Sequence, residues 1–217
     1  MGFKLGFVRC LFLSLVVLSA GCAELNRLRE ENASLYQNVE ELEREKADLA
    51  DKYTLSEEEK ARLIEERDSL ERARHDMEGK LRGTGASVRI KDGKIAVVLP
   101  SSIFFNSGQA TLKKDVKKDL NKICDVIKND FPAETIRIEG HTDSDPIKKT
   151  KDLYASNWEL SAMRAVNVLH FLVDESHLDP KRLYIAGFGE YQPVASNKTS
   201  KDKKKNRRVE IVVLSNE

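Results

Sequence analysis

Hydrophobic residues recur every seven positions along the first third of the chain. Seven of the eight residues at one heptad position are apolar. The eight residues are Leu28, Leu35, Leu42, Leu49, Ser56, Leu63, Leu70 and Met77. The stretch from Leu25 to Leu81 contains no proline, and its only glycine is Gly79. This pattern predicts a long coiled-coil helix, which would extend roughly 90 Å over residues 24–82 at about 1.5 Å per residue.

The second heptad position is mixed, and this limits the number of strands in the coil. Asn32 and basic residues such as Lys46 and Arg67 interrupt its apolar residues. Polar side chains in the seam lower stability and favour a low-order oligomer, most simply a parallel homodimer. Two alternatives stay open. Ser56-x-x-Glu59 is a capping box that can start a new helix and permit a hairpin, and the whole segment can be a solvated spacer. The heptad register passes through Ser56 without a slip, which favours one continuous helix.

Beyond residue 82 the heptads give way to short alternating strands and amphipathic helices. Residues 83–87 are rich in glycine and predict a short flexible linker. The apolar runs at 88–91 and 94–99 flank Asp92-Gly93, which predicts a β-hairpin. Further strands are expected at 135–139, 183–186 and 209–214, and helices at 109–129 and 156–175. This order predicts an α/β fold, a two-layer sandwich with a small mixed sheet and helices on one face, preceded by the coiled-coil helix.

Residues 1–21 have the features of a secretory signal peptide. Two basic residues precede an apolar run from Leu11 to Leu18, which is too short to span a bilayer. The sequence Leu18-Ser19-Ala20-Gly21-Cys22 resembles the lipobox of bacterial lipoproteins. This resemblance implies cleavage before Cys22 and lipidation of its sulfur, and Ala23 after the cysteine favours the outer membrane by analogy. An ordinary signal peptide followed by an incidental cysteine is the alternative. The expected organisation is a signal peptide (1–21), a lipidated helix (22–82), a linker (83–87) and a globular domain (88–217).

The charge is unevenly divided between the helix and the domain. Residues 23–82 hold 18 acidic and 12 basic side chains, a net charge of −6, and residues 83–217 hold 18 and 23, a net charge of +5. A mildly basic domain can meet an anionic polymer or surface. The chain has no basic array with interleaved aromatic residues, so we expect no nucleic-acid partner.

Candidate chemistry gathers between Gly140 and Arg164. At about 100° per residue, Arg164 points some 140° away from the apolar stripe of its predicted helix, and Asn157 lies within about 20° of Arg164. Asp143 follows the carboxyl end of a predicted strand, the edge where open α/β sheets tend to place ligands. An acid and a base in this arrangement suit a ligand that bears both an ammonium and a carboxylate. A surface ion pair that only ties a loop to a helix is the alternative.

Several motifs in the domain resemble one known family. They are Phe105-x-x-Gly108-x-Ala110-x-Leu112, Gly140-His141-Thr142-Asp143, Asn157-x-x-Leu160-Ser161-x-x-Arg164-Ala165, Gly187-x-Gly189-Glu190-x-x-Pro193-Val194 and Asn206-Arg207-Arg208-Val209-Glu210. Together they resemble the OmpA-like peptidoglycan-associating domain over roughly residues 88–217, and Asn157-Trp158-Glu159-Leu160-Ser161 looks most like the variant in MotB-type flagellar stator proteins.

The resemblance implies that the site holds the diaminopimelate of the peptidoglycan stem peptide. Asp143 would take its ammonium and Arg164 its carboxylate, because a guanidinium fork binds a carboxylate bidentately. Thr142 and Leu160 would frame the pocket, and Asn157 would add an amide bond. Asn106 and Arg208 are further candidates that rest on the motifs alone. The loop from Ser144 to Ser156 is longer than in many OmpA-like domains and departs from the pattern.

Enzymatic and metal chemistry are not expected. The chain places no serine or cysteine with a base and an orienting acid, and no pair of carboxylates is spaced for glycan hydrolysis. His141 and Asp143 make an incomplete set of metal ligands, so a structural role for His141 is favoured and neither a metal nor another cofactor is expected. We therefore expect an outer-membrane lipoprotein that faces the periplasm and tethers the envelope to the cell wall. The alternative is a component of a flagellar motor or envelope machine, with the domain as wall anchor and the coiled coil as the partner-binding segment.

Overall fold

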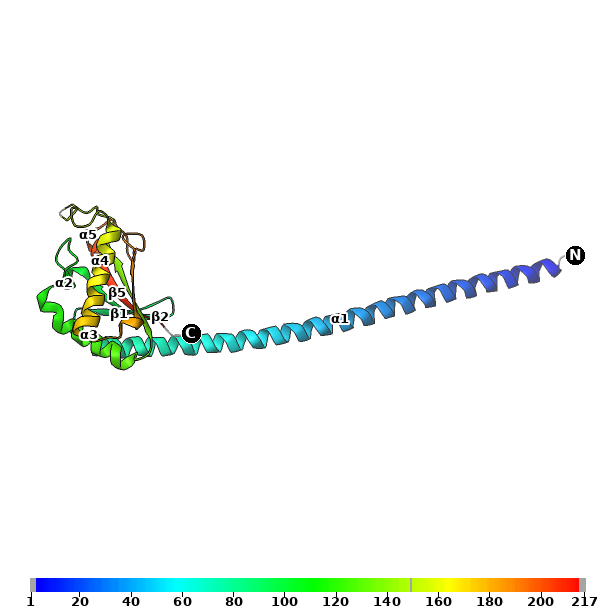
Figure 1. Ribbon diagram of the computed structural model, residues 1–217. Coiled ribbons are helices and arrows are strands. Elements are labelled where there is room, and N and C mark those ends of the chain that lie inside the picture. Colours follow the sequence, from blue (N-terminus) through cyan, green and yellow to red (C-terminus); the bar gives the residue numbers. More distant parts are fainter. Residues whose placement is uncertain (1–2, 149, 215–217) are drawn as a thin grey trace. The chain divides into compact units, whose positions relative to one another are not determined.

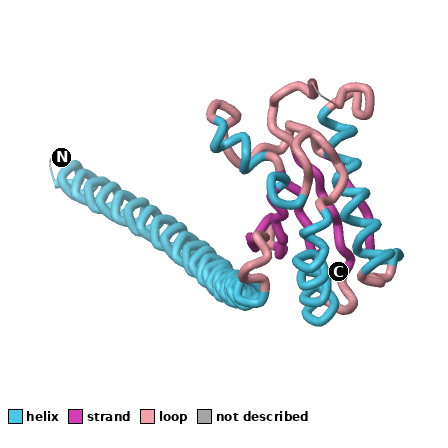
Figure 2. Tube along the Cα trace, turned by 90° about the vertical axis from the view of Figure 1, so that its left-hand side faces the viewer, coloured by secondary structure: helices cyan, strands magenta, loops and turns pink. Residues whose placement is uncertain are grey.

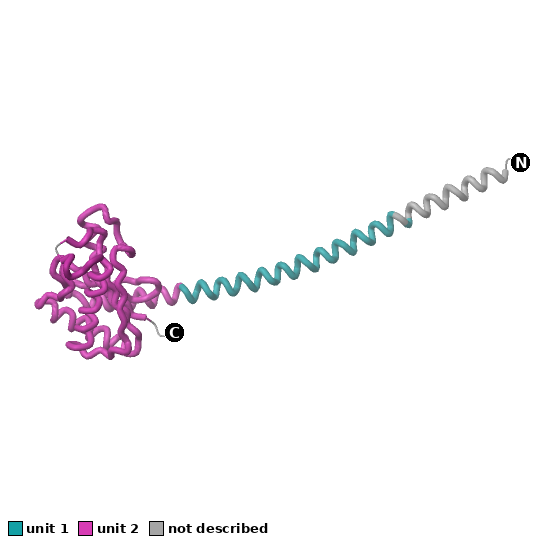
Figure 3. Tube along the Cα trace, turned by 45° about the horizontal axis from the view of Figure 1, so that its top comes forward, with its two compact units in different colours: residues 1–63 teal, residues 64–217 magenta. Residues whose placement is uncertain are grey.

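The computed structural model describes the backbone of residues 3–148 and 150–214, and the side chains of residues 22, 24–148 and 150–214. The signal peptide predicted for residues 1–21 lies outside the described side chains. The chain divides into two compact units, residues 1–63 and residues 64–217 (Figure 3). The second unit contains the sheet and the candidate site.

One continuous helix, α1 (Phe3–Lys80), occupies the first unit and enters the second (Figure 1). The helix passes through Ser56 without interruption, as the heptad register predicts. The leucines of the principal heptad position from Leu28 to Leu63 are between 48% and 68% exposed. None of the helices in the described part of the chain has a stretch that is long and apolar enough to cross a bilayer.

Five strands form one mixed sheet, which confirms the predicted fold class (Figure 2). The strand order is β1-β2-β5-β3-β4. β3 and β4 are parallel and the other neighbouring strands are antiparallel. The strands are β1 (Ser87–Lys91), β2 (Lys94–Pro100), β3 (Thr135–His141), β4 (Leu183–Gly187) and β5 (Arg208–Leu214). Asp92 and Gly93 form the tight turn between β1 and β2 with φ angles of 49° and 70°, as expected for an Asp-Gly hairpin.

Helices cover one face of this sheet (Figure 1). The principal ones are α3 (Lys117–Asp130) and α4 (Asn157–His170), and α4 continues into the π-helical segment η2 (Phe171–Glu175). The short elements are α2 (Ser101–Phe104), η1 (Lys114–Val116), η3 (Pro180–Arg182) and α5 (Ser200–Asn206). Alternate strand residues, such as Ile136 and Ile138 of β3, point into the core under the helices.

The last turns of α1 belong to the core of the second unit. Met77 and Leu81 are 1% and 2% exposed and pack within the same hydrophobic cluster as the sheet. The predicted linker is also ordered against the domain, since Thr84 is buried and its hydroxyl donates to the carbonyl of Leu81 at 2.8 Å. The folded unit therefore begins before the domain boundary predicted at residue 88.

Two local predictions differ from the structure. The helix predicted from Gln109 begins at Lys117, because the preceding segment forms a bridge between Phe105 and Leu112 and the carbonyls of residues 109 and 110 accept bonds from side chains of α4. At the start of α4, Ser156 makes no side-chain cap bond. The sequence Ser156-Asn157-Trp158-Glu159 has the pattern of a second capping box, but Glu159 accepts from the backbone N–H of Ala155 instead.

Candidate functional site

Five of the seven predicted binding residues surround one cavity of about 470 Å³. The cavity lies where β3 ends and α4 begins. It is lined by Ser107, Gly108, Thr142, Asp143, Asp145, Pro146, Ile147, Lys148, Thr150, Asn157, Leu160, Arg164 and Arg207. Asp143 and Arg164, which lie 21 residues apart in the sequence, therefore line the same cavity.

Gly140 permits the close approach of β3 and α4 that builds this cavity. A Cβ atom at Gly140 would lie 1.9 Å from the backbone carbonyl oxygen of Ser161, a distance that no side chain can tolerate. The missing side chain lets the end of β3 lie directly under the first turns of α4. Asp143 and Arg164 are brought together by this packing.

Arg164 is buried, with only 3% of its surface exposed. Its Nε donates to the carbonyl of Gln109 at 3.0 Å, and its guanidinium lies 5.5 Å from the centre of the Phe105 ring. Its Nη1 has no hydrogen-bond partner among the described residues. Burial lowers the pKa of Arg164 to about 10, and the nearby charge of Arg207 acts in the same direction. Arg164 is thus a fixed cation at neutral pH with an unsatisfied donor.

Asp143 is nearly as buried, at 5% exposure. One oxygen of its carboxylate accepts from Nη1 of Arg207, and the other accepts from the backbone N–H of Asp145 at 3.3 Å. These contacts fix the orientation of the carboxylate. A buried and oriented anion can make charge-assisted bonds to an ammonium group.

Asn157 and Thr142 hold the backbone around Asp143. The amide of Asn157 donates to the carbonyls of Asp143 and Asp145, at 3.3 and 3.1 Å. The backbone N–H of Thr142 donates to the carbonyl of Gly189 at 2.8 Å, and its hydroxyl is buried without a partner in the described part of the chain. Asn157 is expected from the sequence to contact a ligand, but its amide group instead donates to backbone carbonyls of the loop. Leu160 lines the cavity with an apolar side chain.

The long loop at residues 144–156 forms one side of the cavity. Pro146, Ile147 and Lys148 line it. Thr150 donates through its hydroxyl to the carbonyl of Gly108 at 2.7 Å. Nζ of Lys203 lies 2.6 Å from the carboxylate of Asp145, which lowers the pKa of that carboxyl. The loop is thus held by two contacts to other segments of the domain.

The two residues that were proposed from motifs alone do not line this cavity. Asn106 is exposed, and Arg208 is buried in a separate cluster on the other face of the sheet, where it pairs with Glu210. Arg207, which is not among the residues predicted from the sequence, lies beside Asp143. Successive residues at the start of a strand point to opposite faces. That alternation separates Arg207 from Arg208, but the sequence does not say which of them faces the site.

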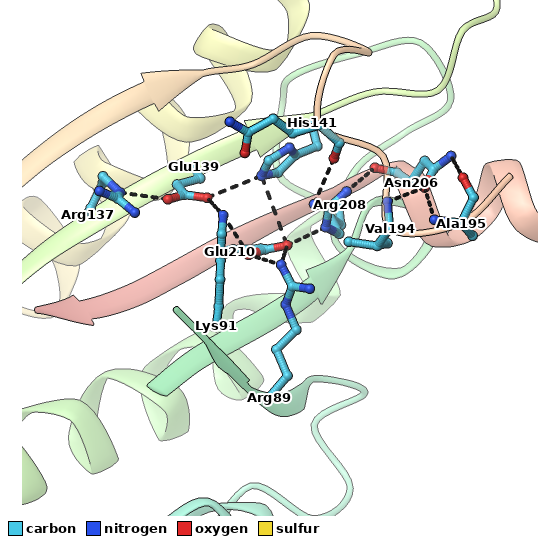
Figure 4. Close-up of polar contacts among 11 residues, drawn as sticks. Arg89, Lys91, Arg137, Glu139, His141, Val194, Ala195, Asn206, Arg208 and Glu210 are labelled. Atoms are coloured by element: carbon cyan, nitrogen blue, oxygen red, sulfur yellow. Dashed lines mark hydrogen bonds and ion pairs between the residues drawn. The ribbon is translucent and has the colours of Figure 1, made fainter. Parts of the chain in front are cut away.

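A buried network of charges occupies the sheet face opposite the helices (Figure 4). Its centre holds two fully buried carboxylates, Glu139 on β3 and Glu210 on β5. Arg137 lies 2.6 Å from Glu139, and Arg89 lies 2.5 Å from Glu210. Further cations reach the same carboxylates, namely Lys91 for Glu139 and Arg208 for Glu210.

His141 completes this network as a structural side chain. Its Nε2 lies 3.4 Å from Glu139, and its ring stacks on Phe188 with centroids 5.2 Å apart. Burial lowers the pKa of His141. Glu139, His141 and Glu210 place ligand atoms within 4.8 Å of one another, a set that sequence reasoning missed because two strands contribute to it. The surrounding cations already neutralise both carboxylates, which favours an ion-pair network over a metal centre.

Comparison with known proteins assigns the fold to a family. The OmpA family model matches residues 104–207. Motility protein B of Bacillus subtilis is 41% identical over 143 residues, which are 64% of this chain and 49% of that protein. The Escherichia coli K12 protein named "Probable lipoprotein YiaD" is 36% identical over 134 residues, which are 62% of this chain and 58% of that protein. The chain thus spans about half the length of the curated relatives it matches.

A solved structure gives the same result. The cell wall anchor of the T6SS from Pseudomonas aeruginosa superposes with a TM-score of 0.56 at 27% identity, over 64% of this chain and 93% of that one. The matched family segment contains the strands β3 and β4, the helix α4 and every predicted residue of the cavity. Residues 104–207 of this chain are therefore an OmpA-family domain of the peptidoglycan-associating OmpA/MotB type.

Proposed function

We propose that the domain binds peptidoglycan noncovalently through the diaminopimelate of the stem peptide. In this proposal the carboxylate of Asp143 receives the ammonium of the ligand, and the guanidinium of Arg164 receives its carboxylate. The observation that carries the proposal is the pairing of a buried, unsatisfied cation with a buried, oriented anion around one cavity. A zwitterionic amino-acid end group complements both charges.

The energetics favour a ligand of this kind. A buried donor without a partner costs about 1–3 kcal/mol, and a bound carboxylate would remove that cost at Arg164. The cavity volume of about 470 Å³ falls in the range of small-ligand sites. Arg207 already contacts Asp143, so an incoming ammonium would share that carboxylate with Arg207 or displace it.

We propose further that the site binds its ligand without chemical change. Two carboxylates line the cavity, Asp143 and Asp145, as a glycan hydrolase would require. Each is paired with a cation, however, and the pKa of Asp145 is lowered, first by its bond from Lys203. A general acid needs a raised pKa. The pairing keeps Asp145 ionised and supports a binding role.

Binding to isolated sacculi tests this function. Asp143→Ala and Arg164→Ala should each abolish cosedimentation of the chain with purified sacculi. Free diaminopimelate should inhibit the binding of the wild-type chain to sacculi. Lys117→Ala is a matched control, because Lys117 forms an exposed ion pair with Glu175 outside the cavity. Circular dichroism checks that each variant is folded. Undiminished binding by both cavity variants would refute the assignment.

We also propose that the chain is a lipoprotein of the outer membrane whose domain lies in the periplasm and tethers the envelope to the wall. The lipobox before the exposed Cys22 and the name of the Escherichia coli relative support this anchor. Incorporation of labelled palmitate, and its loss in Cys22→Ser, tests it. The second candidate is a motor or envelope-machine component, which the likeness to motility protein B and to the T6SS wall anchor supports equally. If the wild type incorporates no palmitate, that candidate is favoured.

A further inference from the structure

An aromatic pair stands in solvent beside the cavity. Trp158, the only tryptophan of the chain, stacks on Tyr191 with ring centroids 5.0 Å apart and an angle of 24° between the rings. Trp158 is 48% exposed and Tyr191 is 63% exposed. Part of each ring contacts the other ring, and much of the remaining ring surface is exposed to solvent. Large aromatic rings normally gain stability by burial, so this exposure indicates a surface for a ligand.

The pair is held by the same contacts that build the cavity. Gly189, with a φ of 55°, adopts a left-handed conformation that favours glycine, and it places the loop of Tyr191 next to the first turn of α4. The N–H of Gly189 donates to the hydroxyl of Ser161 at 2.9 Å, and its carbonyl accepts from Thr142 at 2.8 Å. The aromatic pair is therefore tied to the segment that carries the cavity carboxylate.

The pair and the cavity lie around the same helical turn. Asn157 and Leu160 line the cavity, and Trp158 lies between them in sequence. At about 100° per residue, Trp158 projects roughly 120° away from Arg164 around the axis of α4. The helix end thus separates the two surfaces by about the width of a helix, roughly 10 Å.

We propose that Trp158 and Tyr191 form a platform for the sugar rings of the glycan strand whose stem peptide enters the cavity. This inference rests on the proposed function. The faces of pyranose rings carry C–H groups, which pack on the negative face of an aromatic ring. In peptidoglycan two amino acids separate diaminopimelate from the lactyl group of the sugar. An extended chain of that length spans roughly 7–10 Å, about the width of the helix end.

Polar residues around the pair suit such a ligand. Gln192 is exposed and Glu190 is half-buried in the same loop as Tyr191, and Glu159 follows Trp158 on α4. Hydroxyl and N-acetyl groups of a glycan can bond to side chains of this kind at the edge of an aromatic face. Trp158 lies within one helical turn of the cavity residues Asn157 and Leu160, which favours the glycan over an unrelated protein partner as the occupant.

The fluorescence of Trp158 gives a direct test, because no other tryptophan contributes to the signal. The probes are a peptide-free glycan oligomer from digested peptidoglycan and free diaminopimelate, each titrated into residues 22–217 without lipid. The glycan should change the emission in a saturable way. Tyr191→Ala should weaken glycan affinity about fivefold, as expected for the loss of roughly 1 kcal/mol, while Tyr191→Phe keeps it. Tyr36→Ala, an exposed tyrosine on α1, is the matched control and should have no effect.

The two proposals fail separately in this experiment. Asp143→Ala should lose diaminopimelate binding and still show the glycan response. If Asp143→Ala binds diaminopimelate like the wild type while the glycan response persists, the cavity assignment fails and the platform stands. No fluorescence change at glycan concentrations that displace the protein from sacculi would overturn the platform. Equal losses of glycan and diaminopimelate affinity in Tyr191→Ala, together with a lower melting temperature, would show only a structural pair and would also overturn it.

Discussion

Two glutamates, buried at the centre of the sheet, decide how the domain responds to acid. Burial by itself would raise the pKa of Glu139, but the bonds from His141 and Lys91 and the charge of Arg137 outweigh it and lower that pKa to about 2. The pKa of Glu210 is lowered in the same way, since the cations outweigh the effect of burial. Both carboxylates therefore hold their charge more firmly in the folded chain than in the unfolded one.

We predict a loss of stability in acid from these shifts. A carboxyl whose pKa is depressed by folding stabilises the folded state above its unfolded pKa, near 4.5 for Glu139, and this contribution disappears as the pH falls toward 2. The shift of Glu139 corresponds to about 3 kcal/mol. His141 acts in the same direction, because its lowered pKa means that the unfolded chain takes up the proton first below about pH 6.5. Urea unfolding at pH 7, 4.5 and 3 should show the decline.

A single substitution tests how much Glu139 contributes to the stability of the folded chain. Glu139→Gln should lower the free energy of unfolding at pH 7 by roughly 2–3 kcal/mol, because Lys91 and Arg137 lose their partner. It should also flatten the decline between pH 4.5 and 3. Glu175→Gln, in an exposed pair, should leave both quantities nearly unchanged. A decline that is as steep in Glu139→Gln as in the wild type would contradict this account.

At the scale of elements, α1 plays two parts. Its first part presents exposed leucines, and its last turn buries Met77 in the core of the folded unit, where Leu81, directly after the helix, is also buried. The same heptad position therefore serves two different purposes along one helix. Leu70 marks the change, because it is partly buried against the core.

We predict that the end of α1 is needed for the stability of the domain. Leu81→Ala should lower the free energy of unfolding by about 2–5 kcal/mol, since it removes a buried side chain and leaves a cavity. Leu49→Ala, at an exposed position with 68% exposure, is the control and should have a small effect on the unfolding of the domain. Urea denaturation followed by circular dichroism near 220 nm and by Trp158 fluorescence distinguishes the domain from the helix. Equal effects of the two variants on the fluorescence transition would contradict the prediction.

At the scale of the whole molecule, the exposed leucines of α1 indicate a surface that binds a second helix. A stripe of half-exposed leucines from Leu28 to Leu63 is more apolar surface than a single soluble chain normally presents in one line. The seam of the predicted parallel dimer would end near residue 63, because the side chain of Met77 is buried in the core of the second unit and cannot contact a second helix. At about 1.5 Å per residue, residues 24–63 supply roughly 60 Å of coiled coil.

We predict that residues 24–217 form a dimer through this seam. Light scattering should report twice the mass of one chain, and the double substitution Leu42→Lys and Leu49→Lys should give the mass of one chain. Leu55→Lys is the control, because Leu55 is exposed but lies outside the seam. The domain transition in the double variant should be unchanged. A wild type that remains monomeric at micromolar concentrations would show that the helix is a spacer.

Local patterns determined the continuous helix, the Asp92-Gly93 hairpin, the strands and the α/β class, because heptads, alternation and turn chemistry act between residues close in sequence. Helix phase also placed Asn157 and Arg164 on one side of α4. The motifs located Asp143.

Only the tertiary structure decided which partners these residues meet. It selected Arg207 over Arg208 beside Asp143, joined Glu139 to Glu210 across neighbouring strands, and drew Met77 into the domain. It also stacked Trp158 on Tyr191, which lies 33 residues further along the chain. Each of these contacts depends on strand order and on helix packing, and these are set by burial over the whole domain and not by any local pattern.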